Sequence, residues 1–181
     1  MNVYDFDKTI YPVDSTAQFY RWCLRRYPAC RRTLGWTAWG FFLAGTRLKT
    51  LTGGKELFYR FLRYVPADAP EVFWREHIGN IYPWYLAQRQ ADDLVISASP
   101  EFLLAPAAKA LGFSLLASPV EQSTGRYLGL NCRGEEKVRR FREAYGDAPV
   151  DRFWSDSRAD TPMAALAGEA FLVRNGVPEP W

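Results

Sequence analysis

Two acidic side chains stand two residues apart just after the first apolar segment of the chain. Val3 begins this strand-like segment, and Asp5 and Asp7 lie where the strand gives way to a turn. At this spacing, one carboxylate is able to attack a substrate as a nucleophile while the other donates and accepts a proton. The chain has one histidine, His77, without a partner motif, so carboxylates, hydroxyls and lysine must carry the chemistry.

A second acidic pair, Asp156 and Asp160, follows another strand-like segment at residues 150–155. Carboxylates gathered from two strands repel each other unless a cation lies among them, and an oxygen-only site with few protein ligands suits Mg²⁺. Lys137, in the first turn of a predicted helix, adds a positive charge close to a helix N-terminus, which also favours anions. Together these groups predict a phosphate site.

The elements that must position these groups alternate between strand and helix. We expect strands at residues 3–6, 94–96, 113–116, 150–155 and 170–173, with helices over 100–111 and from residue 134. This alternation is typical of an α/β fold with a Rossmann-like parallel sheet between two helical layers. Ligands bind at the carboxyl ends of such strands, so we expect Asp5, Ser97 and Asp156 to converge there.

Residues 14–80 carry a different pattern, with apolar side chains at helical spacing and N-cap candidates from Asp14 onward. This segment is too long for one crossover between strands. We therefore predict a helical cap inserted at 14–80 into a core made of 1–13 and 81–181. Its predicted helices carry three apolar sets: Phe19, Trp22 and Cys23; Trp36, Trp39, Phe42 and Leu43; and Phe58, Phe61, Leu62 and Val65.

Taken in order, these segments resemble the four motifs of the haloacid dehalogenase-like (HAD) superfamily of phosphohydrolases, over most of the chain. The run from Asp5 to Thr9 is similar to its first motif, Leu94–Ser97 to its second, Lys137 to its third and residues 155–160 to its fourth. The insertion resembles the cap of the phosphoserine-phosphatase-like branch. Lys8 stands where the superfamily often has glycine.

The resemblance implies a Mg²⁺-dependent phosphatase acting on a small-molecule phosphate ester through an aspartyl-phosphate. Asp5 would be the nucleophile and Asp7 the general acid and base. The implied ligands of Mg²⁺ are the Asp5 carboxylate, the Asp7 backbone carbonyl and Asp156, with Asp160 in support. The implied phosphate-binding residues are Ser97 and Lys137, which would grip phosphoryl oxygens, and Thr9, which would orient the first loop.

Other interpretations stay open. The same scaffold could transfer the phosphoryl group to an alcohol, act on a lipid-type phosphate, or bind a phosphate ligand without catalysis. Lys137 alone would also fit a solvated charged face shared with Arg139 and Arg140. Ser99 competes with Ser97 for the phosphate role, and we assign Ser99 to capping the helix that begins at Pro100.

Composition excludes several classes of protein. The 181 residues carry a net charge of +3, with 23 basic and 20 acidic side chains, too balanced for a nucleic-acid binder. Three separated cysteines support neither a disulfide framework nor a zinc site, which fits a reducing cytoplasm. The acidic start does not fit a secretory signal, and the most apolar run, 36–45, is too short for a transmembrane segment. Oligomeric state stays open.

The predicted cap is rich in aromatic and basic residues. Core packing beneath a solvated face explains this composition, but so does weak contact with a membrane surface or a lipid-like phosphate ester, because Trp and Arg together suit that boundary. Residues 52–55 (TGGK) lack the spacing of a nucleotide-binding phosphate loop and fit a helix start better. The aromatic and basic side chains are Tyr20, Trp22, Arg25, Arg26, Tyr27, Arg31, Arg32, Trp36, Trp39, Phe41 and Phe42.

Overall fold

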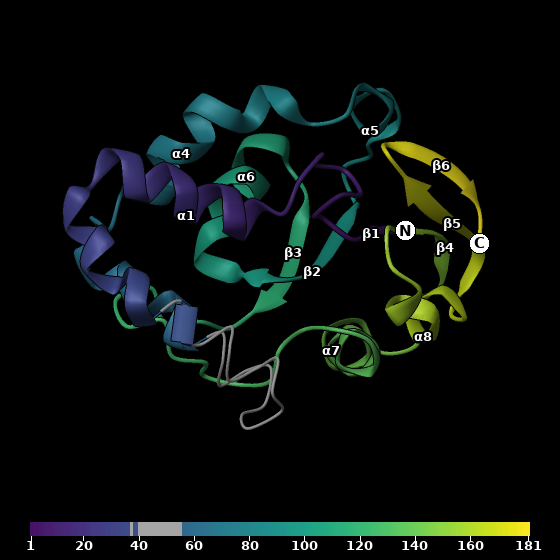
Figure 1. Ribbon diagram of the computed structural model, residues 1–181. Helices are drawn as coiled ribbons and strands as arrows, with labels where there is room; N and C mark the ends of the chain where they lie inside the picture. The colour runs from purple at the N-terminus through teal and green to yellow at the C-terminus, as the bar shows by residue number, and fades with distance from the viewer. Residues whose placement is uncertain (37, 40–55) are drawn as a thin grey trace.

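A single sheet forms the centre of the described part of the chain (Figure 1). The computed structural model describes residues 1–36, 38–39 and 56–181. Its sheet has six strands in the order β3-β2-β1-β4-β5-β6, and β1 pairs in parallel with both β2 and β4. The residues directly after β1 therefore lie at the middle of the sheet's carboxyl edge. The strands are β1 (Asn2–Tyr4), β2 (Leu94–Pro100), β3 (Ser114–Ser118), β4 (Val150–Ser155), β5 (Ala167–Arg174) and β6 (Val177–Pro180).

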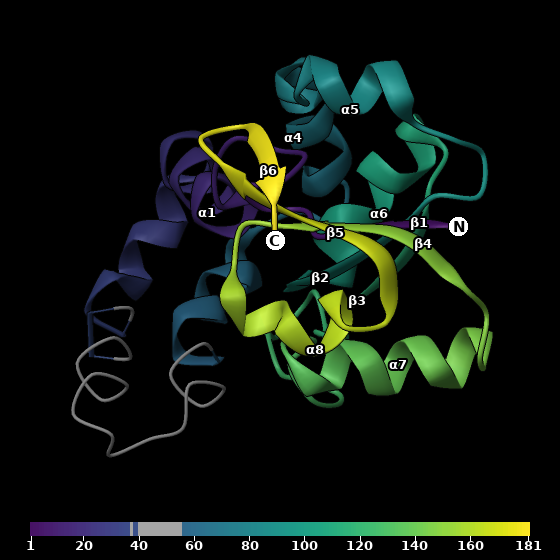
Figure 2. The ribbon, with the colours of Figure 1, turned by 90° about the vertical axis from the view of Figure 1, so that its right-hand side faces the viewer.

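Helices cover both faces of the sheet, as predicted for an α/β fold with three layers (Figure 2). One face carries α7 (Glu135–Tyr145) and α8 (Thr161–Ala164), and the other carries α6 (Glu101–Leu111) with α4 and α5. A short 3₁₀ helix, η4 (Arg158–Asp160), precedes α8. Between β1 and β2, the described residues include the helices α1 (Ser15–Arg26), η1 (Pro28–Thr33), η2 (Tyr59–Tyr64), α4 (Ala69–His77), η3 (Ile78–Asn80) and α5 (Pro83–Gln88).

Successive side chains of a strand point to opposite faces of the sheet, and this explains why helices pack on both faces. Val3 and Phe153 point to the α7 side, where they join one buried cluster with Phe141. Tyr4 and Trp154 point to the opposite side, and their rings stack with centroids 4.4 Å apart. Both β1 and β4 therefore bury apolar side chains on both faces, as the inner strands of a parallel sheet do.

The helical insertion shares its core with the sheet. Phe19, Phe73 and Trp74 from α1 and α4 belong to the same buried cluster as Tyr4. Trp74 Nε1 also donates to the carbonyl of Leu103 in α6, at 2.6 Å. The predicted helices at Phe19 and at 58–65 are present, the second largely as the 3₁₀ helix η2. The predicted Phe42 and Leu43, and the helix start at 52–55, lie outside the described residues.

Two predicted helix ends are confirmed. The Asp14 carboxylate caps α1 by accepting a hydrogen bond from the Ala17 amide at 2.8 Å. Gly112 ends α6 in the left-handed region, with φ +79°. The ring of His77, the histidine without a partner motif, stacks on Phe73 with centroids 4.3 Å apart.

The sheet has one further strand at its edge, β6, which is not among the strands predicted from the sequence. β6 runs antiparallel to β5, and the two strands are joined at Asn175 and Gly176. Both residues have positive φ, +51° and +80°, which is the backbone geometry of a tight hairpin turn. An Asn-Gly pair is a strong sequence signal for such a hairpin, so this strand was predictable.

Gly125 marks a close approach between η2 and the segment after β3. A Cβ atom at this position would lie 2.2 Å from Tyr59 Cβ, and φ is already +75°. We expect Gly125→Ala to destabilise the protein by about 1–3 kcal/mol or more, because the clash adds to the backbone strain. Chemical denaturation would measure this effect. Gly112→Ala is the matched control, since it has a similar φ and nothing within 4 Å of the new methyl group, and equal losses in both variants would refute the steric argument.

Candidate active site

Three separate parts of the chain meet at the carboxyl edge of the sheet around one lysine. Asp5 directly follows β1, and its amide donates to the Trp154 carbonyl of β4 at 2.8 Å. Lys137, in the first turn of α7, places Nζ 2.6 Å from Asp5 Oδ1 and 2.7 Å from Asp160 Oδ2. Asp160 lies in η4, just after β4. The structure therefore brings together Asp5, Lys137 and Asp160 from predicted motifs one, three and four.

These three groups are almost fully buried, so their charges interact strongly. Burial raises the pKa of Asp5 to about 6, against the opposing effect of the Lys137 ammonium, and the negative charges of Asp160 and Asp156 add to the rise. Burial alone would lower the pKa of Lys137, but the carboxylates of Asp5 and Asp160 raise it above its ordinary value. Lys137 is therefore a permanent cation in this site.

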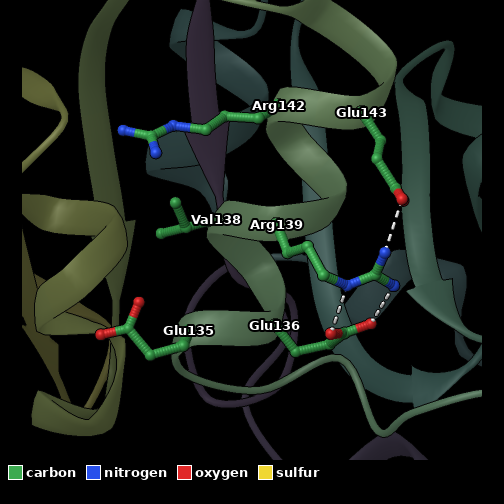
Figure 3. A pocket seen from close by; sticks show the side chains of 6 residues that line it. All are labelled: Glu135, Glu136, Val138, Arg139, Arg142 and Glu143. Carbon is green, nitrogen blue, oxygen red and sulfur yellow. Dashed lines mark hydrogen bonds and ion pairs between the residues drawn. The ribbon is translucent and has the colours of Figure 1, made fainter.

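Lys137 does not belong to the solvated face of its helix. Figure 3 shows the outer side of α7, where Arg139 pairs with Glu136 and Glu143. Lys137 is 1% exposed and points to the opposite side, toward the sheet. The interpretation of Lys137 as a surface charge shared with Arg139 is wrong, because its neighbours are two buried carboxylates.

Thr9 links the first and fourth motifs inside the protein. Its fully buried hydroxyl accepts a hydrogen bond from the Asp156 amide at 2.9 Å. The same hydroxyl lies 3.5 Å from Asp5 Oδ2 and from the Asp7 carbonyl oxygen, as a donor. This agrees with the predicted orienting role of Thr9 in the first loop. The contact between Thr9 and a phosphate group stays a prediction.

Asp7 lies in the first loop, and its side chain contacts the start of α1. Its Oδ1 accepts a hydrogen bond from the Ser15 amide at the start of α1, at 2.8 Å. Burial raises the pKa of Asp7 to about 7, repulsion from Asp14 contributes, and hydrogen bonds from Ser99 and Ser15 oppose the rise. A carboxyl group with a pKa near neutrality is suited to both giving and taking a proton.

The assignment of Ser99 to helix capping is wrong. The N-cap of α6 is Pro100, which has no side chain able to cap, because β2 continues to Pro100 and α6 begins one residue later. The Ser99 hydroxyl instead donates to Asp7 Oδ2 at 2.5 Å. Ser97 is buried within β2, and its hydroxyl oxygen accepts from the Ser99 amide at 3.1 Å.

The backbone of Lys8 has a conformation that glycine adopts more easily than other residues do. Its φ of +56° lies in the left-handed region, which explains why glycine would suit this turn. The side chain is exposed, and its charge opposes the rise in the pKa of Asp156 that burial causes. Lys8 therefore adds positive charge beside Asp156 at the exposed rim of the site.

Sequence reasoning missed two serines that support the site. The buried Ser155 hydroxyl donates to Asp160 Oδ2 at 2.8 Å, so this oxygen is held by both Ser155 and Lys137. Ser15 holds Asp7 through its backbone amide, a contact that depends on where α1 begins. Ser155 was detectable as a hydroxyl at the end of a buried strand directly before Asp156.

The oxygen donors at this edge fit Mg²⁺ better than a transition metal. Within the described residues, no group of three His, Cys, Asp or Glu side chains is arranged to hold a metal ion. The available donors are the carboxylates of Asp5 and Asp156 and the backbone carbonyl of Asp7. Mg²⁺ commonly takes one or two carboxylates and keeps several waters. Burial raises the pKa of Asp5, the negative charges of Asp160 and Asp156 add to the rise, and a cation at this edge would offset both effects.

An open groove of about 860 Å³ borders Asp156. It runs between the loop after β1, α1 and the β5–β6 turn, and three cationic side chains line it: Lys8, Arg21 and Arg174. Asp14 and Asp156 are the acidic residues on its wall. Cationic side chains therefore outnumber acidic ones on the wall of this groove.

Comparison with known proteins agrees with this geometry. Residues 3–165 match the family model of haloacid dehalogenase-like hydrolases, so the chain belongs to this family. The protein CicA of Caulobacter vibrioides is 30% identical over 200 aligned positions, which cover 97% of this chain and 86% of CicA.

Two crystal structures share the fold. A protein of unknown function from Bordetella pertussis Tohama I has a TM-score of 0.68 and 23% identity, with 94% of this chain and 87% of that chain covered. A phosphoserine phosphohydrolase-like protein from Francisella tularensis subsp. tularensis SCHU S4 has a TM-score of 0.59 and 14% identity, with 94% and 86% covered. The fold expected from the resemblance, an α/β core with a helical insertion, is therefore confirmed.

Proposed function

We propose that this chain is a Mg²⁺-dependent phosphomonoesterase that acts on a small-molecule phosphate ester through an aspartyl-phosphate at Asp5. The observation that carries the proposal is the buried Lys137 ammonium between Asp5 and Asp160, at the sheet edge where Asp7 and Asp156 also lie. A permanent cation beside a buried carboxylate offsets the repulsion that a nucleophile of this charge meets when it approaches a phosphate dianion.

In the first step, an Asp5 carboxylate oxygen attacks phosphorus. The bond between Asp5 and phosphorus forms while the bond between phosphorus and the ester oxygen breaks. Asp7 gives its proton to the departing oxygen, so the product is a neutral alcohol. Lys137 and the Ser97 hydroxyl bind the phosphoryl oxygens, which carry the charge of the transition state.

In the second step, water attacks the aspartyl-phosphate. Asp7, now ionised, takes a proton from this water, the new oxygen–phosphorus bond forms, and the bond to Asp5 breaks. Inorganic phosphate and the original Asp5 carboxylate result. A pKa near 7 lets the same Asp7 group serve both steps.

The residues that would hold Mg²⁺ are Asp5, Asp7 through its backbone carbonyl, and Asp156, with Asp160 in support. When bound, Mg²⁺ supplies charge neutralisation between the nucleophile and the phosphoryl group. Asp160 acts through Lys137 and Ser155, because both donate to its Oδ2.

We further propose the division of the chain into a core, 1–13 and 81–181, and a cap, 14–80. The contact from Ser15 to Asp7 supports it, since the Ser15 amide joins the first helix of the cap to the catalytic loop of the core. A cytoplasmic location is proposed because Cys23, Cys30 and Cys132 are all free and buried.

Hydrolysis of p-nitrophenyl phosphate by the purified protein, with Mg²⁺ and with a chelator, tests the proposal. We expect metal-dependent release of nitrophenolate and phosphate in equal amounts. An added acceptor alcohol separates hydrolysis from transfer, because a phosphotransferase would release nitrophenolate in excess over phosphate. Stoichiometric binding of phosphate by folded protein, without turnover of any ester, would instead support a non-catalytic binder.

A second candidate function, action at a membrane surface on a lipid-type phosphate, has one observation in its favour. Trp36 and Trp39 are 49% and 52% exposed, and the Arg60 guanidinium lies 4.2 Å from the centre of the Trp36 ring. Aromatic and cationic groups together suit an anionic lipid interface. Trp22 does not contribute, because it packs against Phe19 and donates to Glu76. None of the described helices has the length and apolar character of a membrane span.

We expect this surface to bind phosphatidylglycerol vesicles weakly and phosphatidylcholine vesicles not at all, as measured by flotation. Replacement of both Trp36 and Trp39 by Ala should abolish the binding, because it removes the apolar part of the contact. The matched control replaces Leu128 and Leu130, which are 62% and 64% exposed elsewhere, and it should leave binding intact. Absence of wild-type protein from the floated anionic vesicles would remove this candidate.

A further inference from the structure

Ser99 lies in an irregular part of β2 directly beside the candidate active site. Ser97 of β2 pairs with Ala117 of β3, and the next pair is Pro100 with Ser118, so Ala98 and Ser99 interrupt the ladder between them. An irregularity of this kind re-aims side chains that a regular strand would place elsewhere. Here the redirected side chain is the Ser99 hydroxyl, which is 5% exposed.

The Ser99 hydroxyl contacts both the first motif and the start of α1. It donates to Asp7 Oδ2 at 2.5 Å. It also lies 3.0 Å from the Thr16 hydroxyl and accepts a hydrogen bond from the Ser15 hydroxyl at 3.3 Å. The Ser15 amide holds the other oxygen of Asp7. Both carboxyl oxygens of Asp7 are therefore fixed, one by the helix terminus and one by Ser99.

The backbone of Ser99 reaches a second group of the site. Its amide donates to the Ser97 hydroxyl oxygen at 3.1 Å. This bond occupies one lone pair of the Ser97 hydroxyl and does not use its proton, which a phosphate contact would require. One residue thus contacts the group proposed to protonate the leaving oxygen and the group proposed to bind the phosphoryl oxygens.

We propose that Ser99 is a positioning residue whose hydroxyl holds the Asp7 carboxyl in the orientation that delivers its proton to the leaving oxygen. This inference rests on the proposed phosphatase function. The balance of the step is unchanged: the proton moves from Asp7 to the ester oxygen, and Ser99 keeps its own proton. Without the hydroxyl, Asp7 loses the contact at Oδ2 and gains rotational freedom, which lowers the fraction of time spent in a productive orientation.

The test compares wild type and Ser99→Ala on phenyl phosphate and p-nitrophenyl phosphate, in the presence of Mg²⁺. These esters have similar shapes, but nitrophenolate leaves with little help from an acid while phenolate needs a proton. We expect kcat/KM on phenyl phosphate to fall by about tenfold or more, within the contribution of general acid catalysis. On p-nitrophenyl phosphate, kcat/KM should change much less. In an Asp7→Asn background, Ser99→Ala should have no further effect.

Equal losses on both esters, or a full additional loss in the Asp7→Asn background, would show that Ser99 only supports the fold and would overturn the inference. Full activity of Ser99→Ala on both esters would do the same. No turnover of either ester by wild type would overturn the proposed function and the inference with it. Thr33→Val is the matched control, because it removes another buried hydroxyl, one that donates to the Cys30 carbonyl in η1. If Ser99→Ala does not fold, the nearly isosteric Ser99→Cys takes its place.

Discussion

Asn in place of Asp5 is expected to reduce hydrolysis of p-nitrophenyl phosphate by about 10⁴-fold or more, because the amide cannot form the covalent intermediate. The fold should survive the change. Burial disfavours the charged form of Asp5 and raises its pKa to about 6, so a neutral amide of the same shape is not expected to unfold the protein. The amide oxygen is still able to accept from Lys137, and Asp160 continues to balance the ammonium.

The measurement is nitrophenolate release at equal protein concentration, together with circular dichroism and a thermal melt for each variant. Intact-mass analysis of quenched reactions should detect a phosphorylated wild-type chain and no phosphorylated Asp5→Asn chain. The exposed Asp147→Asn is the control for a change of charge alone and should retain full activity. Wild-type rates in the Asp5→Asn variant would show that the nucleophile is misassigned.

The placement of Asp5 and the acidic segment after β4 at one edge of the sheet was predictable from the sequence, because the fold rules of parallel sheets are strong. Apolar runs that end in polar residues predict strands, and parallel strands present their carboxyl ends at the same edge. Asp5 and Asp160 are far apart in the chain, yet both lie within hydrogen-bonding distance of one ammonium group. The resemblance to a known family then supplied chemical roles that spacing alone left open.

The role of Ser99 was not predictable, because it depends on a local departure from regular structure. Serine followed by proline favours a helix N-cap, and that local preference was a reasonable guide. The irregular pairing of β2 with β3 carries the strand on to Pro100 and turns the Ser99 side chain toward Asp7. Such an irregularity is set by contacts between strands, and no local pattern encodes it.

Lys137→Met is expected to destabilise the protein by about 3–5 kcal/mol, because it leaves two buried carboxylates without their cation. Asp5 and Asp160 both direct an oxygen at Nζ, at 2.6 and 2.7 Å, and each is at most 7% exposed. Activity should be lost as well, since the phosphoryl oxygens lose a cationic partner. Urea denaturation and nitrophenolate release measure the two effects on the same preparations.

A matched control lies two residues further along the same helix. Arg139→Met also removes a cation, but Arg139 pairs with Glu136 and Glu143 on the solvated face (Figure 3), so the free energy of unfolding should hardly change. Adding Asp160→Asn to Lys137→Met should recover part of the lost stability, because one uncompensated charge is removed, without recovering activity. If Lys137→Met is as stable as wild type, the two carboxylates are not held by this cation in solution, and the electrostatic account of the site is wrong.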